Sequence, residues 1–365
     1  MHRGLFALAL AATLFVFCMP DLAHADPIVF PYTAIQLTEQ VNRIPNLFGL
    51  LNALNVFPSQ GITSTLIEIR RTDGVLNVLP ARERGGPASV ARRKIGDTLY
   101  LEVPHFPHDD FIVPQDLQNM LGANRQVRTL EVEMAERLLA IRNKHAITRE
   151  WLRMGALRGE ITDGDGNVLY NLFNAFDVNK KVIVFDLDDD NFDIDEACNE
   201  LYQYMAGALR GEVMNGVEIL VASDFFSKFR SHPKVIRWFL NQPAALRMID
   251  QDRVQSGGQY GRVFEYGNLY WREYLGIAPL VLAGVETSAP FVPTGKGYAR
   301  PLGTLSTFRT YDAPANDMRY VNTPGREIYI SPKVKDHGEG VELKSQSNPL
   351  AICRRPELLV EVQLA

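Results

Sequence analysis

The sequence predicts an α+β protein, because helical and strand-like patterns occupy separate stretches of its 365 residues. One long segment, from about Asp116 to Arg158, repeats apolar residues at helical spacing. Short runs that alternate polar and apolar residues, such as "LIEIR" and "LYLEV", precede it. A further compact set of helices and strands follows over residues 191–290. A chain of this length and pattern can bury a sizeable core and is expected to form two or more lobes.

The composition is that of a globular protein without a strong charge bias. Hydrophobic residues make up 46% of the chain, and 38 basic against 43 acidic residues give a formal net charge of −5. Dedicated nucleic-acid binders carry a concentrated basic excess, so we expect any contact with nucleic acid to be weak or confined to one face. Three widely spaced cysteines, Cys18, Cys198 and Cys353, exclude a disulfide framework and a four-cysteine metal site, which favours a reduced compartment.

The N-terminus conflicts with a reduced compartment. Residues 1–25 contain Arg3, an apolar run from Leu5 to Phe17, and Ala-His-Ala at 23–25, a pattern typical of a secretory signal and its cleavage site. The apolar run is too short to span a bilayer comfortably, and no long uncharged apolar stretch follows it. We therefore expect a soluble mature chain with no membrane partner.

Residues 26–59 predict an N-terminal arm that packs on another part of the molecule. The segment is rich in proline and contains one short helical pattern, for which Thr38 is the expected N-cap. The apolar positions at helical spacing are Val41, Ile44 and Leu47 or Leu51.

Residues 60–105 predict a long two-stranded excursion with an Asp73-Gly74 turn. Its centre, from Ala81 to Asp97, holds arginines, a lysine and three glycines but few large apolar side chains. Such a ribbon has little core of its own, so we expect it to lie on another surface.

The predicted long helix has one apolar stripe and one charged face. The stripe consists of Val127, Leu130, Met134, Leu138 and Ile141. The opposite, solvated face consists mainly of Arg128, Glu131, Glu133, Glu136 and Arg137.

Further elements follow the long helix. "GEITDGDGNVLYNLFNAF" predicts two strands around a tight turn. The next unit contains a helix over 195–211, the strand "VEILVAS", a helix from Phe225 to Leu240, and the strand-like "RVFEYGNLYWREY". The last 70 residues predict short strands and loops, and Val360, Val362 and Leu364 alternate with polar residues as in a half-buried strand.

Two acidic stretches imitate known sites. Asp163, Asp165 and Asn167 match the first ligand positions of a calcium loop, but Val168 replaces the required glycine and Asn174 the bidentate glutamate, so a hairpin turn is favoured. Asp186-Leu187-Asp188 follows an apolar strand, as in phosphotransferases with an aspartate nucleophile. No threonine or valine stands two residues after Asp188, and a solvated acidic linker is the favoured interpretation.

"VPHFPHDD", residues 103–110, is the strongest candidate for a metal site. His105, His108 and either Asp109 or Asp110 are the residue types that bind zinc or non-haem iron. The prolines at 104 and 107 prevent a regular helix, so the histidines would be held on a bend. The alternative is structural: an aspartate caps the following segment, and the histidines form hydrogen bonds across the bend.

No enzymatic motif is present in the sequence. It contains no serine nucleophile elbow, Walker loop or dinucleotide fingerprint, and "SGGQYG" at 256–261 lacks the strand-to-helix context of a phosphate loop. We therefore predict no catalytic or cofactor-binding residues, no cofactor, and no enzymatic activity.

The order of these parts resembles the lambda-like major capsid proteins of tailed phages, the capsid protein E family, over roughly residues 30–365. The most specific matching stretches are "FPYTAIQLTEQVNRIPN", "GVLNVLPARERGG", "VPHFPHDD", "GVEILVASDFFSKF" and "PELLVEVQLA". The resemblance implies the capsid fold of the Hong Kong phage type, with an N-terminal arm, an extended β loop, a peripheral domain with a spine helix, and an axial domain.

The resemblance also assigns a role to each segment. It implies an extended loop at 60–105, a peripheral domain at 106–190 with the spine helix inside 116–158, and an axial domain at 191–290. Residues 291–365 would return to the peripheral domain and supply the C-terminal strands. "VPHFPHDD" then lies where the loop re-enters the body, which favours its structural interpretation.

The implied function is a structural one, in which many copies form an icosahedral shell around double-stranded phage DNA. Expected partners are other copies in pentamers and hexamers, scaffolding, portal and decoration proteins, and DNA bound without sequence specificity. Assembly would take place in the host cytoplasm, which leaves the signal-like residues 1–25 unexplained except by an upstream start-site error or a decayed prophage copy. Two alternatives are a nanocompartment shell that encloses a cargo enzyme and an exported binding or envelope protein.

Overall fold

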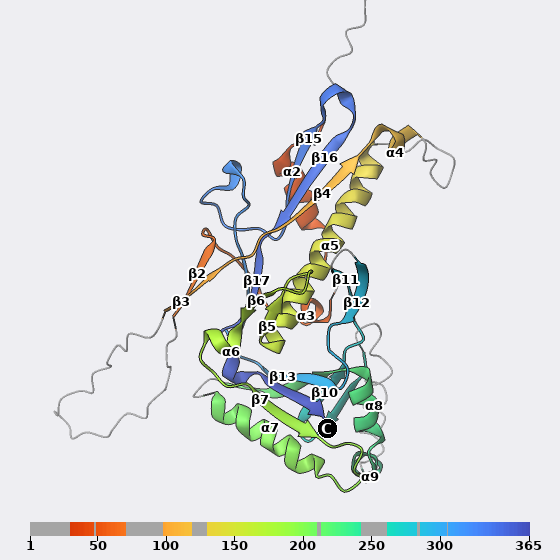
Figure 1. The fold of residues 1–365 in the computed structure, drawn as a ribbon, viewed down its shortest axis with the longest axis vertical. Coiled ribbons are helices and arrows are strands. Elements are labelled where there is room, and N and C mark those ends of the chain that lie inside the picture. Colours follow the sequence, from red (N-terminus) through yellow and green to blue (C-terminus); the bar gives the residue numbers. More distant parts are fainter. Residues whose placement is uncertain are drawn as a thin grey trace, which may run out of the picture.

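The structure is a computed structural model that describes residues 30–46, 49–70, 98–118, 130–209, 213–241, 261–282, 285–304 and 306–365. The signal-like residues 1–25 and the centre of the predicted loop, with its Asp73-Gly74 turn, lie outside these ranges. The described chain is elongated, and helix α5 runs from a small upper sheet toward a larger lower lobe (Figure 1). None of its helices is long and apolar enough to cross a bilayer.

The described residues form both helices and strands, and after residue 261 they form strands and short 3-10 turns. The helices are α2 (Ala34–Arg43), α3 (Leu50–Ala53), α4 (Pro114–Gln118), α5 (Leu130–Arg158), α6 (Leu172–Ala175), α7 (Ile194–Ala208), α8 (Ser223–Ser231) and α9 (Pro233–Asn241), with 3-10 turns at Met318–Tyr320, Asp336–Gly338 and Pro356–Leu358. The strands are β1 (Ser59–Gly61), β2 (Leu66–Arg70), β3 (Thr98–Glu102), β4 (Phe106–Ile112), β5 (Glu160–Thr162), β6 (Val168–Asn171), β7 (Lys181–Phe185), β8 (Gly216–Val221), β9 (Val263–Tyr266), β10 (Leu269–Glu273), β11 (Ile277–Leu282), β12 (Val285–Pro290), β13 (Lys296–Leu302), β14 (Phe308–Asp312), β15 (Tyr329–Val334), β16 (Val341–Ser347), β17 (Pro349–Cys353) and β18 (Val360–Leu364).

The lower lobe is a six-stranded sheet in the order β7-β18-β13-β8-β10-β9. Its apolar face packs against α7 and α8, which lie on the lower side of the sheet (Figure 1). Trp271 of β10 stacks on Phe225 and Phe229 of α8, with ring centroids 5.9 and 4.1 Å apart. Strands β9 and β10 form a hairpin whose Gly267-Asn268 turn has positive φ at both residues, as a tight hairpin turn requires.

The predicted boundaries at 190 and 290 do not coincide with this sheet. Strand β7 comes from the segment assigned to the peripheral domain, and β13 and β18 come from the segment assigned to the return path. The C-terminal strand lies between β7 and β13, inside the lobe. Alternation of polar and apolar residues predicts a strand but does not identify its partners, which explains why the sheet and the predicted boundaries differ.

The upper unit is a three-stranded sheet, β15-β16-β4, with α2 and α5 packed against it. Thr38 does not cap α2: the helix begins at Ala34, and Thr33 forms a capping box with Gln36. Thr38 lies inside the helix, where its hydroxyl donates to the Ile330 carbonyl and accepts from the Ile330 amide. It therefore fastens the arm to β15.

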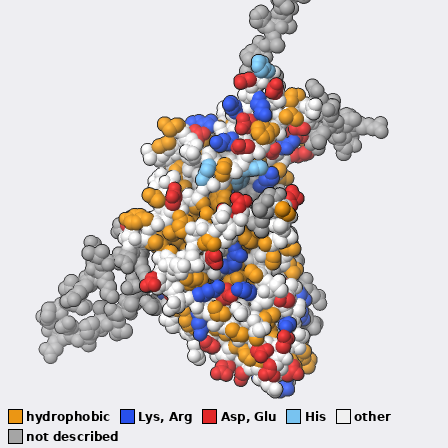
Figure 2. All heavy atoms as spheres, in the orientation of Figure 1, with side chains coloured by type: hydrophobic (Ala, Val, Ile, Leu, Met, Phe, Trp, Pro, Cys, Tyr) orange, Lys and Arg blue, Asp and Glu red, His pale blue; other side chains and the backbone are white. Residues whose placement is uncertain are grey.

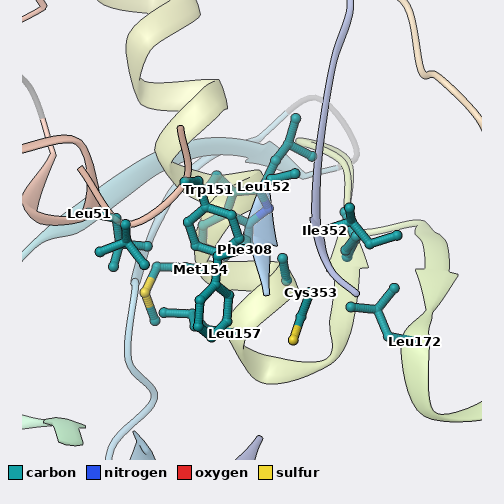
Figure 3. Close-up of a cluster of buried hydrophobic side chains, with 14 of the residues drawn as sticks. Leu51, Trp151, Leu152, Met154, Leu157, Leu172, Phe308, Ile352 and Cys353 are labelled. Carbon is teal, nitrogen blue, oxygen red and sulfur yellow. The ribbon is translucent and has the colours of Figure 1, made fainter. Parts of the chain in front are cut away.

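Helix α5 changes character along its length. Met134, Leu138 and Ile141 are buried as predicted, but Glu133, predicted on the solvated face, is also buried and pairs with Arg137 at 2.9 Å. From Ala146 onward almost all side chains are buried. Figure 3 shows Trp151, Leu152, Met154 and Leu157 of this lower half packed among side chains from other elements, including Leu51, Phe308 and Ile352.

The base of the predicted loop belongs to the subunit core. Strands β2 and β3 pair in antiparallel register from Leu66↔Glu102 to Arg70↔Thr98. Ile67 and Leu101 are buried in the same cluster as the lower half of α5, and the Tyr170 hydroxyl donates to the Glu102 carbonyl. The base of the ribbon therefore packs on other elements of its own subunit, which agrees with the expectation that it lies on another surface.

Candidate functional site

The segment "VPHFPHDD" forms most of an edge strand rather than a bend. From Phe106 it is β4, which pairs with β16 from Phe106↔Ser347 to Ile112↔Val341. Pro107 is tolerated because β4 pairs on one side only, and an edge strand can do without one donor. Proline excludes a helix here but permits an edge strand, a possibility that the predicted bend did not include.

His105 is engaged by Asn348. Its Nδ1 lies 2.8 Å from Asn348 Oδ1, while the amide nitrogen of Asn348 donates to the Pro314 carbonyl. Because the Asn348 oxygen accepts, the Nδ1 atom of His105 carries the proton and donates. This arrangement fastens the segment before β4 to the segment after β16.

His108 is engaged by Lys144 of α5. The Nζ atom of Lys144 lies 3.0 Å from His108 Nε2, so Nε2 accepts from the ammonium group and the imidazole is neutral. Burial, reinforced by Lys144, lowers the pKa of His108. A metal could therefore bind His108 Nε2 only by displacing this lysine.

His145 of α5, which the sequence did not single out, lies beside His108. The Ser345 hydroxyl donates to the His108 carbonyl at 2.7 Å. Because its proton is used there, Ser345 Oγ accepts from His145 Nε2 at 3.1 Å. The Ser347 hydroxyl then donates to His145 Nδ1 at 2.8 Å. These bonds hold His145 neutral with its proton on Nε2, and they connect α5 to β16 and β4.

The aspartates of this segment do not cap a helix. Asp110 accepts from the Phe111 amide and from Arg137 at 3.2 Å. The Val113 amide, at the start of α4, is instead bonded by Asp116, which also pairs with Arg137 at 3.2 Å. Across the described residues no group of three or more histidine, cysteine or acidic side chains is arranged to hold a metal ion.

The other two acidic stretches have structural partners. Asp163 accepts from the amides of Asp165 and Asn167 and from the Asn167 side chain, which closes the β5–β6 hairpin. The hairpin prediction is thus confirmed. Asp188 pairs with Lys228 at 2.7 Å, and Asp186 and Asp188 are exposed in the connection from β7 to α7.

The lower half of α5 holds the N-terminal arm through buried ionic side chains. Arg149 forms a bidentate pair with Asp312, with both N–O distances at 2.7 Å, and also donates to Ser59. Arg153 donates to Asn52. These arginines join α5, the arm and β14 in one place.

Glu150 completes this junction. It accepts from the Leu51 amide at 2.8 Å and from the Tyr274 hydroxyl at 2.9 Å, so it bonds both α3 and the segment after β10. Burial raises its pKa. No sequence pattern indicated this role, because charged residues in a helix are normally solvated.

Comparison with known sequences points to one family. The family model described as "Phage major capsid protein E" matches residues 33–364. The major capsid protein of Salmonella phage Felix O1 (isolate Felix O1-VT1) is 34% identical over 351 residues, which cover 90% of this chain and 95% of that protein. The major capsid protein of Pseudomonas phage KPP10 is 31% identical over 350 residues, which cover 92% and 97%.

Solved structures show the same fold. A proposed prophage capsid protein from E. coli CFT073 superposes with a TM-score of 0.60 at 14% identity, covering 92% of this chain and 99% of that chain. A phage-related protein from Bordetella bronchiseptica RB50 superposes with a TM-score of 0.50 at 11% identity, covering 90% and 95%. These likenesses concern the arrangement of the helices and strands.

Proposed function

This chain belongs to the phage major capsid protein E family, and on that premise we propose that many copies of it form the closed icosahedral shell that encloses double-stranded phage DNA. It is a structural protein of the phage head and not an enzyme. Its fold is the α+β capsid fold of tailed phages, as the sequence predicted. The observation that carries the proposal is the family match over residues 33–364.

The arrangement of elements supports an assignment of parts within the shell subunit. We propose that residues 26–59 are the arm and that α5 is the spine helix of the peripheral domain. The extended loop spans 60–105, and its basic centre reaches a neighbouring subunit while its base stays in its own core. The axial domain is the six-stranded lobe, which includes β7, β13 and β18 in addition to elements from 191–290.

Further partners follow from the same function. We propose that scaffolding and portal proteins guide assembly in the host cytoplasm, and that a decoration protein covers the finished shell. DNA contacts are non-specific, which is consistent with the net charge of −5: a strongly basic chain would bind packaged DNA too tightly for release.

Electron microscopy of the purified full-length chain, with nucleic-acid analysis of the particles, tests the proposed function. We expect closed icosahedral shells when the chain is produced with its scaffolding protein, and DNA inside particles recovered from an infected host. Particles that hold a cargo enzyme and no nucleic acid would identify a nanocompartment instead. A periplasmic monomer would identify an exported binding or envelope protein.

A further inference from the structure

One face of the six-stranded sheet carries more positive than negative side chains. Alternate residues of β8 and β18 point into the apolar core between the sheet and helices α7 and α8. Glu218 and Glu361 therefore lie on the other face of the sheet. We call this surface the basic sheet face. It consists of Lys180, Arg272, Lys296 and Arg300 around Glu218 and Glu361, with Glu265 of β9 on the same face.

Each buried glutamate on this face pairs with two cations. Glu361 pairs with Lys180 and with Lys296, the latter at 2.9 Å. The Glu361 side chain is 3% exposed, whereas those of Lys180 and Lys296 are 37% and 40% exposed. One carboxylate neutralises one of the two lysines, so a net positive charge remains where solvent or a partner can reach it.

The second glutamate repeats the arrangement. Glu218 pairs with Arg272 at 2.8 Å and with Arg300, its register partner on β13. Both glutamate side chains are nearly inaccessible to solvent, so they fix the positions of the cations that cover them. The two triplets together leave two uncompensated positive charges on neighbouring strands.

The same lobe presents a segment of opposite charge. The connection from β7 into the first turn of α7, residues 186–196, contains no lysine or arginine. Its exposed acidic residues are Asp186, Asp188, Asp189, Asp190, Asp193, Asp195 and Glu196. Figure 2 shows acidic side chains gathered at the lower end of the molecule and basic ones higher on the lobe.

We propose that the basic sheet face of one subunit binds the acidic segment 186–196 of the next subunit around each ring of the shell. This inference rests on the proposed function, because only an assembling chain brings copies of the lobe together. The two surfaces are different parts of one lobe, so their contact is heterologous, and repeated heterologous contacts close into rings. Electrostatic complementarity of this kind fixes register and suppresses wrong pairings.

The acidic segment is favoured over DNA phosphates as the occupant. Every copy of the chain supplies one acidic segment for one basic face, so the partners are matched in number. Surfaces that bind DNA carry a concentrated basic excess, whereas this face mixes four cations with three carboxylates.

A mixing experiment tests this contact. The face variant is Lys296→Glu, which leaves Lys180 to pair with Glu361. The segment variant carries Asp186→Lys and Asp190→Lys. Each is purified separately, checked for folding by circular dichroism, and sedimented with its scaffolding protein at low and high salt.

We expect each variant alone to need at least about tenfold more protein than the wild type for half-maximal assembly. An equal mixture should assemble better than either alone, since the negative face of one variant then meets the positive segment of the other. Recovery on mixing separates contacts between subunits from contacts within one subunit. Lys333→Glu makes the same charge change on the upper sheet and should assemble normally.

Several outcomes would overturn the inference. They are normal assembly by both variants, or failure of the mixture to recover although both variants are folded. If Lys296→Glu does not fold, Lys296→Gln takes its place. A folded segment variant whose assembly depends on salt as the wild type's does would also overturn the inference. Shells of Lys296→Gln that form normally but retain less short duplex DNA would assign the face to DNA. A wild-type chain that forms no shell would instead refute the proposed function.

Discussion

His145 is held in one protonation state by its surroundings. Both ring nitrogens are bonded to serine hydroxyls of β16, and Ser345 passes the chain of bonds on to the His108 carbonyl. Burial lowers its pKa to about 3, and His108, Arg142, Arg149 and Lys144 act in the same direction. A charged imidazole at this position is therefore strongly unfavourable.

We predict that this histidine makes the unassembled subunit sensitive to acid. An unfolded histidine takes up a proton near pH 6.5, whereas the folded one does not until about pH 3. The stability that His145 supports is fully present above pH 6.5 and is lost as the pH falls through this window. At pH 5 the loss amounts to about 2 kcal/mol.

Urea unfolding of wild type and His145→Gln at pH 7.5 and pH 5 checks this prediction. Other groups titrate in the same range, but they are common to both proteins, so the difference isolates His145. The variant should lose less stability on acidification than the wild type. Equal losses in both proteins would show that the imidazole is not held neutral.

Among the elements, β18 has the most demanding position. It lies between β7 and β13 in the six-stranded sheet, and its Glu361 is buried between two lysines. The sequence predicted a half-buried strand with Glu361 outward, and Val360 and Val362 are indeed buried. Glu361 is equally buried, because the second face of the sheet is covered by charged neighbours.

We predict that a chain ending at Pro356 will be insoluble. Removing β18 detaches β7, exposes the edge of β13 and leaves Lys180 and Lys296 without their carboxylate. Unpaired strand edges promote aggregation. Solubility and circular dichroism of the truncated protein check this, and removal of Ala365 alone is the matched control. Soluble, folded truncated protein would show that the lobe does not need its C-terminal strand.

How far the sequence predicts an element depends on whether local chemistry decides it. The apolar stripe of α5 and the Asp163 turn follow from spacing and hydrogen bonding within a few residues, and both were predicted. Thr38 was misplaced because its partner, Ile330, lies 292 positions away, and Glu133 was misplaced because elements packed on α5 bury it. The Arg149–Asp312 pair spans 163 positions, beyond the reach of any local pattern.

At the scale of the whole molecule, the base and the centre of the predicted loop have different roles. Its base strands contribute Ile67 and Leu101 to the subunit core, while its basic centre lies outside the described residues. The six-stranded sheet gathers strands from three separate segments, and no local pattern in the sequence predicts which distant strands pair.

We predict that the loop centre serves assembly rather than folding. Removing residues 82–93 and closing the gap with a short turn leaves β2, β3 and α5 intact, so the circular dichroism spectrum should be unchanged. Sedimentation should show that closed shells no longer form, because each subunit loses a contact that is repeated over the particle. Shells of normal size would contradict this prediction, and so would a globally unfolded chain.

The central place of β18 also sets the moment at which the subunit matures during translation. Chains emerge from the ribosome with their N-terminal parts first, and domains fold as their residues appear. The place between β7 and β13 stays empty until residues 360–364 have left the exit tunnel. A chain that stops before this strand therefore cannot complete its lobe.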